Sequence, residues 1–303
     1  MMKLIVNLNA GCGRCKKLFP LIRRQLQKEG IEYSGVFTEY PGHARMLAEK
    51  AKKEGYQKIV VCGGDGTINE VVNAIAKQDI TLGIIPMGIG NDIARNLGIR
   101  EDFAFACHTL KNGKVKRIDL IKVKEDKYYV GIGGVGFDAE IVTFINHWKK
   151  FIPGIFIYPF YIGAIIREIL ICKSTKVRIK YDENDFTGDI LMVCFGNIES
   201  YARVIQIAPS VSIDDGLLDM CVVKKINRLR IGYLFLKIFI ESKPFTLPKV
   251  KIYQILPGAK ICRAREVYLQ ADTSLPFHGD AEIISETPLS LKVIPGALRV
   301  IIP

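Results

Sequence analysis

The first 120 residues alternate between short, densely apolar runs and longer segments in which apolar residues recur every three or four positions. The short runs are typical of strands buried in a parallel sheet, and the longer segments are typical of amphipathic helices. We expect strands at residues 3–8, 31–38, 57–62 and 81–86. We expect helices at residues 14–28, 41–54, 67–76 and 103–110. Strands that alternate with helices in this way predict a doubly wound α/β domain.

The pattern changes beyond residue 120, where the apolar runs are shorter and apolar residues alternate with polar ones. This period of two is typical of strands with one solvated face and predicts an antiparallel, β-rich domain. We expect strands at residues 176–181, 190–195 and 217–223, and helices at residues 138–150 and 229–241. The chain is therefore predicted to form two domains, residues 1–120 and residues 121–303.

The apolar run at residues 151–166 is a candidate membrane segment. Prolines and glycines interrupt it, and it is shorter than the roughly 20 residues that a spanning helix needs. We therefore expect it to be buried or to lie at a membrane surface. Trp148, Lys149 and Lys150 precede it and supply an aromatic ring and two positive charges. Such residues are common where proteins contact lipid headgroups.

Composition adds a bias in charge to this picture. The 303 residues are 49% hydrophobic and 24% charged, which is typical of a globular protein, and the net charge is +12. Both halves are basic, as expected for attraction to anionic membranes or nucleotides, and without a recognisable binding motif we do not expect nucleic acid as a partner. The eight cysteines lie mostly in apolar runs, which favours the reducing cytoplasm. Cys12 and Cys15 lack the second pair of ligands that a zinc site needs.

Glycine turns follow three of the expected strands and are the strongest candidates for chemistry. The third strand is followed by residues 63–67, Gly-Gly-Asp-Gly-Thr. Similar turns follow the first strand at residues 7–13 and the fourth strand at residues 87–92. Glycines let the backbone approach a bulky anion, and the amides that open the next helix would point at it. Because neighbouring parallel strands end at one edge of the sheet, we expect the last two turns to lie side by side.

At these turns the chain resembles the bacterial diacylglycerol kinase-like lipid kinases, which are related to sphingosine kinases and more distantly to NAD kinases and phosphofructokinases. The resemblance implies an NAD-kinase/phosphofructokinase-like fold for the first domain. It continues through motifs at residues 134–139, 208–209, 214–219, 280–282 and 295–300. The chain departs from the family pattern at the following positions: Leu8, Ile89, residues 202–204 and Ala281.

The resemblance also implies that the first domain binds ATP and Mg²⁺. The implied ligands are the following: Asn7, Gly11, Gly13, Thr38, Gly63, Gly64, Asp65, Gly66, Thr67, Asn69, Glu70, Gly88, Asn91 and Asp92. Among them, Asp65 is implied to lie beside the phosphates and their Mg²⁺. His43 belongs to a family Gly-His-Ala motif, and we expect it to start a helix rather than to act in catalysis.

In the second domain, the resemblance implies a base and a second metal site. Asp280, with Glu282 as the competing candidate, is implied to accept the proton of the substrate hydroxyl across the cleft between the domains. A structural Mg²⁺ is implied at a loop whose ligands are Ser212, Asp215 and Leu217, with Asp119 connected through water.

We therefore expect a cytoplasmic enzyme, peripherally associated with an anionic membrane, that uses Mg-ATP to phosphorylate a hydroxyl of diacylglycerol or a related lipid. A homodimer is compatible with the sequence. Two other functions remain open. The central glycine motif also suits an NAD kinase-like enzyme, and Ile89, where the family has threonine, suits a non-catalytic regulator that binds lipid or nucleotide.

Overall fold

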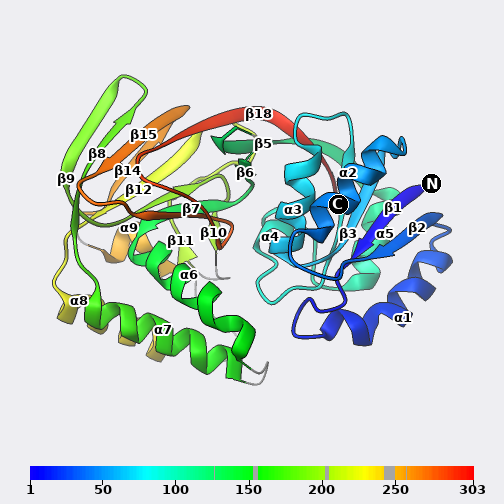
Figure 1. The fold of residues 1–303 in the computed structure, drawn as a ribbon, viewed down its shortest axis with the longest axis horizontal. Coiled ribbons are helices and arrows are strands. Elements are labelled where there is room, and N and C mark those ends of the chain that lie inside the picture. The colour runs from blue at the N-terminus through cyan, green and yellow to red at the C-terminus, as the bar shows by residue number, and fades with distance from the viewer. Residues whose placement is uncertain (126, 153–155, 202–204, 242–249, 257) are drawn as a thin grey trace.

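The computed structural model describes residues 1–125, 127–152, 156–201, 205–241, 250–256 and 258–303 (Figure 1). A helix-rich part formed by the first third of the chain lies beside a strand-rich part formed by most of the remainder. The departure at residues 202–204 lies outside the described residues, as do residues 153–155 of the apolar run at residues 151–166.

The N-terminal part is built on a parallel sheet with the strand order β4-β3-β1-β2. The strands are β1 (Met2–Val6), β2 (Tyr33–Phe37), β3 (Lys58–Gly63) and β4 (Thr81–Pro86). The helices are α1 (Arg14–Lys28), α2 (His43–Lys53), α3 (Asp65–Ile75), α4 (Asp92–Asn96) and α5 (Phe103–Asn112). Residues of β3 and β4 are almost all buried, as their continuous apolar runs require of parallel strands covered on both faces. The predicted doubly wound domain is confirmed.

The C-terminal part is dominated by antiparallel strands, as predicted. Its main strands are β5 (Lys114–Lys124), β6 (Lys127–Tyr129), β7 (Ile132–Gly136), β8 (Thr175–Tyr181), β9 (Asn184–Gly196), β12 (Leu218–Lys224), β14 (Lys260–Ala264), β15 (Glu266–Ala271), β16 (Pro276–Gly279), β17 (Glu282–Glu286) and β18 (Leu289–Ile302). A small separate sheet contains β10 (Ser200–Tyr201), β11 (Ile205–Gln206) and β13 (Val250–Lys251). Strand β8 shows the alternation on which the prediction rested, because its buried and exposed residues follow one another in turn.

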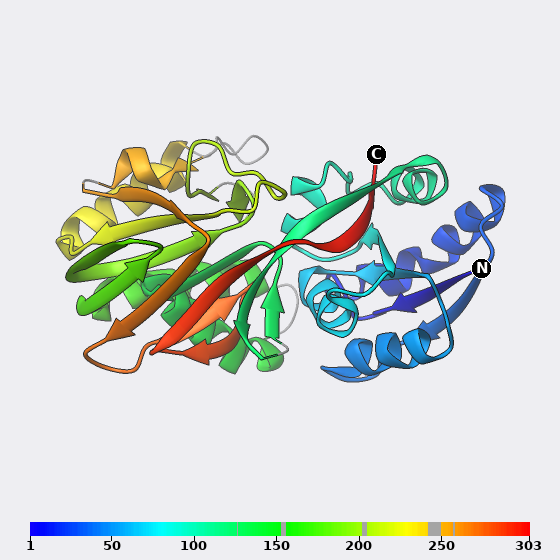
Figure 2. The same ribbon diagram turned by 90° about the horizontal axis from the view of Figure 1, so that it is seen from above.

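Two long strands join the parts. β18 pairs antiparallel with β5 along most of its length, and its end pairs parallel with β4, where Arg299 lies opposite Thr81. Figure 2 shows these two strands running together from the strand-rich part into the helix-rich part. The last strand of the chain therefore completes the sheet of the first domain, and the predicted boundary at residue 120 lies within β5.

Helices cover one face of the strand-rich part (Figure 1). They are α6 (Phe137–Trp148), the short 3₁₀ helix η1 (Lys149–Phe151), α7 (Ile157–Ile171), α8 (Arg228–Glu241) and α9 (Ile252–Ile255). Most of the apolar run at residues 151–166 belongs to η1 and α7. Ala164 and Ile169 of α7 are buried, whereas Ile166 and Leu170 are exposed. No helix among the described residues combines the length and the apolar character needed to cross a bilayer.

Candidate active site

The glycine turns that follow β1, β3 and β4 meet at one edge of the parallel sheet. A Cβ atom added to Gly88 would lie 2.7 Å from the Cα of Gly64, so two backbones are in contact there. A Cβ atom added to Gly11 would lie 2.4 Å from the carbonyl oxygen of Met87, and Gly11 has a positive φ of 62°. Side chains would separate these turns, so the glycines are required by the contact itself. The expectation that the turns lie side by side is confirmed.

Asn7 connects the turn after β1 to the turn after β3. Its Nδ2 donates a hydrogen bond to Thr67 Oγ1 at 3.0 Å, and its Oδ1 accepts one from the amide of Asn9 at 3.0 Å. Thr67 is buried and packs over Gly63, where a Cβ would lie 2.9 Å from the threonine Cβ. Both predicted ligand side chains therefore hold the turns together.

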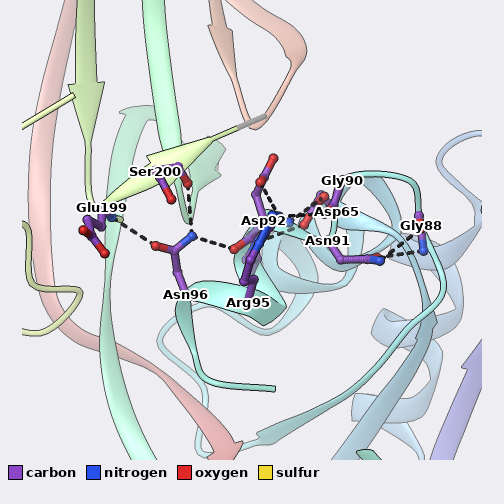
Figure 3. A network of polar contacts seen from close by, with 10 residues as sticks. Asp65, Gly88, Gly90, Asn91, Asp92, Arg95, Asn96, Glu199 and Ser200 are labelled. Atoms are coloured by element: carbon purple, nitrogen blue, oxygen red, sulfur yellow. Dashed lines mark hydrogen bonds and ion pairs between the residues drawn. The ribbon is translucent and has the colours of Figure 1, made fainter. Parts of the chain in front are cut away.

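Asn91 closes the turn after β4 in the same manner (Figure 3). It is fully buried and has a φ of 53°, a left-handed conformation that asparagine tolerates better than most residues. Its Oδ1 accepts a hydrogen bond from the Gly88 amide at 2.7 Å, and its Nδ2 donates to the Gly88 carbonyl at 3.0 Å. The side chain therefore acts as a brace across residues 88–91.

Asp65 lies between the turns, at the N-terminus of α3. Its carboxylate accepts hydrogen bonds from the amides of Asp92 at 3.1 Å and Ile93 at 3.0 Å, so it also caps the start of α4. The pKa of Asp65 is raised to about 6, chiefly by burial and also by the nearby charge of Asp92, against the opposing effect of the two amide donors. The charged form is thus held in an environment where a cation would stabilise it.

Asp65 and Asp92 are the best-placed pair for a cation. The Oδ2 atoms of the two residues lie 3.0 Å and 3.3 Å from one point, the position that a Cβ on Gly90 would occupy. Mg²⁺ is commonly held by one or two carboxylates together with substrate phosphates. The described residues contain no cluster of three or more histidine, cysteine or acidic side chains suited to a metal. The pair therefore fits a metal whose remaining ligands come from a nucleotide and water.

A chain of contacts leads from this pair to the second part of the molecule (Figure 3). Arg95 Nη2 donates to Asp92 Oδ1 at 2.6 Å and to the Gly90 carbonyl at 2.7 Å. Asn96 Nδ2 then donates to the Ser200 carbonyl at 3.1 Å, and Asn96 Oδ1 accepts from the Glu199 amide at 3.2 Å. The sequence analysis did not select Asn96, because its partners are backbone atoms more than 100 residues away.

The opposite side of the site is the hairpin turn between β16 and β17. Asp280 and Ala281 form its two-residue loop, with φ values of 51° and 63°. The Asp280 carboxylate accepts hydrogen bonds from the amides of Val130 and Gly131, both at 2.8 Å, and from Asn69 Nδ2 at 2.8 Å. A further amide, that of Ile132, lies at 3.2 Å. The pKa of Asp280 is raised, because desolvation outweighs the lowering effect of these donors.

Glu282 follows this turn and is more accessible than Asp280. Its side chain is 51% exposed, and its Oε1 lies 3.3 Å from Lys149 Nζ. The same oxygen is 3.9 Å from the position of a Cβ on Gly66, in the central glycine turn. The structure therefore brings the predicted acidic turn of the second domain against the predicted phosphate turn of the first.

Three other predicted residues lie beside the site. Glu70 accepts hydrogen bonds from the Gly42 amide at 2.9 Å and the Ala44 amide at 3.0 Å, which fastens the start of α2 to α3. Thr38 follows β2, and its amide donates to the Val6 carbonyl at 2.9 Å. His43 is the first residue of α2, as expected, and stacks on Tyr40.

The second predicted metal loop is closed by contacts within the protein. Asp215 Oδ1 accepts a hydrogen bond from the Leu217 amide at 3.1 Å, and Asp215 Oδ2 lies 3.6 Å from Arg263 Nη2. Asp119 is 2% exposed and accepts from the amides of Gly216 at 2.7 Å and Gly296 at 2.8 Å. Both carboxylates therefore already have donors within the protein, as Asp65 and Asp92 do, and the second metal site stays a prediction.

Comparison with protein-family models adds the decisive observation. Residues 1–123 match the model described as the diacylglycerol kinase catalytic domain, and residues 131–302 match the YegS C-terminal NAD kinase beta sandwich-like domain. The chain belongs to the diacylglycerol kinase family of lipid kinases. This confirms the resemblance on which the site was predicted.

Individual members of the family match over nearly the whole chain. A diacylglycerol kinase of Staphylococcus epidermidis is 28% identical over 99% of this chain and 92% of that protein, and one of Staphylococcus aureus strain MRSA252 is 29% identical over the same shares. A solved diacylglycerol kinase structure from Bacillus anthracis is 23% identical, with a TM-score of 0.73, over 100% of this chain and 96% of that one. A second solved structure from that organism has a TM-score of 0.76 at 24% identity. These two structures support the fold.

Proposed function

We propose that this family member is an ATP- and Mg²⁺-dependent kinase that phosphorylates a hydroxyl of diacylglycerol or a related lipid at the cytoplasmic surface of an anionic membrane. The observation that carries the proposal is the approach of the Glu282 carboxylate to Gly66, which places a candidate base from one domain against a phosphate turn of the other. Phosphoryl transfer needs this combination of a phosphate cradle, a cation site and a group that orients the attacking hydroxyl.

The first domain would hold the nucleotide. The glycine turns bring backbone together at two contacts, Gly11 with Met87 and Gly64 with Gly88. Asp65 and Asp92 would hold Mg²⁺, which supplies charge neutralisation at the transferred phosphoryl group when it is bound. The buried braces Thr67 and Asn91 would keep the turns in place without moving when the nucleotide binds.

The second domain would provide the base, and the contacts favour Glu282 over Asp280. Both oxygens of Asp280 already accept two hydrogen bonds each, one from Val130 and Asn69 and the other from Gly131 and Ile132. Desolvation leaves the pKa of Asp280 raised, but these four donors occupy the lone pairs that a substrate hydroxyl would need. Glu282 is half-exposed and reaches toward Gly66. In this assignment Asp280 positions the turn, and Glu282 takes the hydroxyl proton.

A phosphorylation screen tests the proposal. Purified protein would be incubated with radiolabelled ATP, Mg²⁺ and one acceptor at a time: diacylglycerol, monoacylglycerol, phosphatidylglycerol, sphingosine or NAD. We expect label in a lipid that carries a free hydroxyl, and loss of that label in Glu282→Gln. Label in NAD alone would establish the NAD kinase-like alternative. Binding of ATP without transfer to any acceptor would favour the regulator.

A further inference from the structure

The outer faces of α7 and α8 carry an unusual concentration of exposed apolar side chains. More than half of the exposed large hydrophobic residues in the described chain belong to these two helices and to the adjoining segment at residues 148–156. On α7 three exposed residues recur at every fourth position and Ile171 follows the last of them, and on α8 they recur at intervals of four and three. These residues are the following: Ile162, Ile166, Leu170, Ile171, Leu229, Tyr233 and Leu236.

This pattern is a second apolar face, distinct from the one that packs on the protein. Ile169 of α7 and Ile231 of α8 are buried on the inner side. A Cβ on Gly232 would lie 3.9 Å from Ile169 Cγ2, so the two helices are in contact with each other. The outward side chains therefore form one two-helix surface, with Leu229 83% exposed and Leu170 66% exposed. Soluble proteins rarely expose contiguous apolar surface of this kind unless it binds a partner.

Charge on this surface selects the partner. Arg167, Lys173, Arg228 and Arg230 are all exposed on the two helices or at their ends. Among the side chains that the structure describes on α7 and α8, the only carboxylate is Glu168, which is buried and paired with Arg167 at 3.2 Å. Apolar residues bordered by cations, with no exposed carboxylate described between them, match a bilayer that contains anionic lipid.

The surface also adjoins the active site. η1 connects α6 to the segment leading into α7, and it carries the exposed ring of Phe151 beside Trp148. The first residue of η1, Lys149, makes the ion pair with Glu282. A bilayer in contact with these rings would therefore lie next to the candidate base, where a lipid hydroxyl must arrive.

We propose that the outer face of α7 and α8, together with Trp148 and Phe151, docks this kinase onto an anionic phospholipid bilayer and presents the membrane lipid to Glu282. The presentation of the lipid to Glu282 rests on the proposed function, whereas the docking rests on the surface of α7 and α8 alone. Insertion of the apolar stripes supplies affinity, and the bordering cations restrict binding to membranes of negative charge.

Vesicle flotation tests the docking. The probes are vesicles of phosphatidylcholine alone and vesicles in which about a third of the lipid is phosphatidylglycerol. We expect the protein to float with the anionic vesicles at about 0.05 M salt, to dissociate as the salt approaches about 0.5 M, and to ignore the neutral vesicles. Leu170→Glu and Leu229→Glu are each expected to weaken binding about tenfold or more, because each removes one inserted leucine and adds a repelled charge.

Tyr268→Glu is the matched control, since Tyr268 is an exposed residue of β15, a strand that Figure 1 shows away from α7 and α8. It should bind vesicles as the unmodified protein does, and the thermal unfolding of all variants should be unchanged. Arg230→Glu, a surface charge reversal, provides a second test that leaves the apolar stripe intact. Unaltered vesicle binding by the leucine variants, or equal binding to both kinds of vesicle, would overturn the proposal. Loss of a dimer in the leucine variants, without a change in vesicle binding, would show that the surface joins two copies instead.

A soluble acceptor separates docking from chemistry. With a short-chain diacylglycerol dispersed as monomers, Leu170→Glu and Leu229→Glu should retain the turnover number of the unmodified protein. With vesicle-borne diacylglycerol they should lose activity in proportion to binding. Vesicle binding that depends on these leucines, without phosphorylation of any lipid, would support the docking surface and contradict the proposed function. Equal loss of activity with both acceptors would overturn the docking role and place the helices in catalysis.

Discussion

Replacing Asp65 by asparagine should separate stability from catalysis. In the folded protein the pKa of Asp65 is raised from 3.8 to about 6, with burial as the largest cause. A carboxyl whose folded pKa is raised destabilises the fold at high pH: the penalty is absent below about pH 4, grows through the interval up to pH 6, and is complete above it. This shift in pKa corresponds to a loss of about 3 kcal/mol in the free energy of unfolding at pH 8.

Asparagine removes this penalty but disturbs one hydrogen bond. Asp65 accepts two amides, and an asparagine side chain has one carbonyl oxygen, so its NH₂ group faces a donor. That loss costs about 1–3 kcal/mol. At pH 8 we therefore expect Asp65→Asn to be at least as stable as the unmodified protein. Near pH 4, where the unmodified carboxyl is protonated, we expect the variant to be less stable.

Denaturant unfolding of both proteins from pH 4 to pH 8, with EDTA present, measures this difference. Turnover with Mg-ATP should fall more than a hundredfold, because loss of a metal worth several kcal/mol in the transition state corresponds to at least two factors of ten. A stability difference that does not change with pH would refute the reasoning from burial. Near-normal activity in the variant would refute the assignment of Asp65 to the metal.

The remaining predictions concern the base, the metal and the turns. Glu282→Gln should lower turnover about a hundredfold or more, with ATP binding and thermal stability unchanged. Asp280→Asn should lower both turnover and melting temperature. A larger loss of turnover in Asp280→Asn than in Glu282→Gln, without a loss of stability, would assign the role of base to Asp280. At limiting Mg²⁺, apparent affinity for the metal should decrease as the pH falls through about 6, because Asp65 becomes protonated, and a flat profile from pH 5 to pH 8 would contradict this. Asp215→Ala should lower the melting temperature. If its loop binds Mg²⁺, added metal should raise the melting temperature of the unmodified protein more than that of the variant, which keeps Asp65 and Asp92. Ala281→Gly should raise the free energy of unfolding by up to about 1 kcal/mol, since residue 281 has a φ of 63°; a decrease would show that the left-handed conformation is not strained.

Local patterns in the sequence determined the elements of this fold and the turns that carry the chemistry. Strand β4 (Thr81–Pro86) is found at the residues predicted, because a short, continuous apolar run between polar segments is typical of a strand buried in a parallel sheet. The turn at residues 63–67 could also be predicted from its glycines, since the contact between Gly64 and Gly88 requires glycine at both positions. The family resemblance rested on the same residues, and it brought Asp280 and Glu282 to attention.

Only the tertiary structure decided what these residues touch. Asp65 caps α4 through amides 27 and 28 positions away, and Asn69 reaches Asp280 across 211 positions of sequence. The return of β18 to the N-terminal sheet, and the emergence of one face of α7 into solvent, are equally non-local. Hydrophobic periodicity reports which side of an element is apolar, but not which partner covers it. Only the packing of the two domains determines that Glu282 is exposed beside Gly66 and that Asp280 is enclosed by hydrogen bonds.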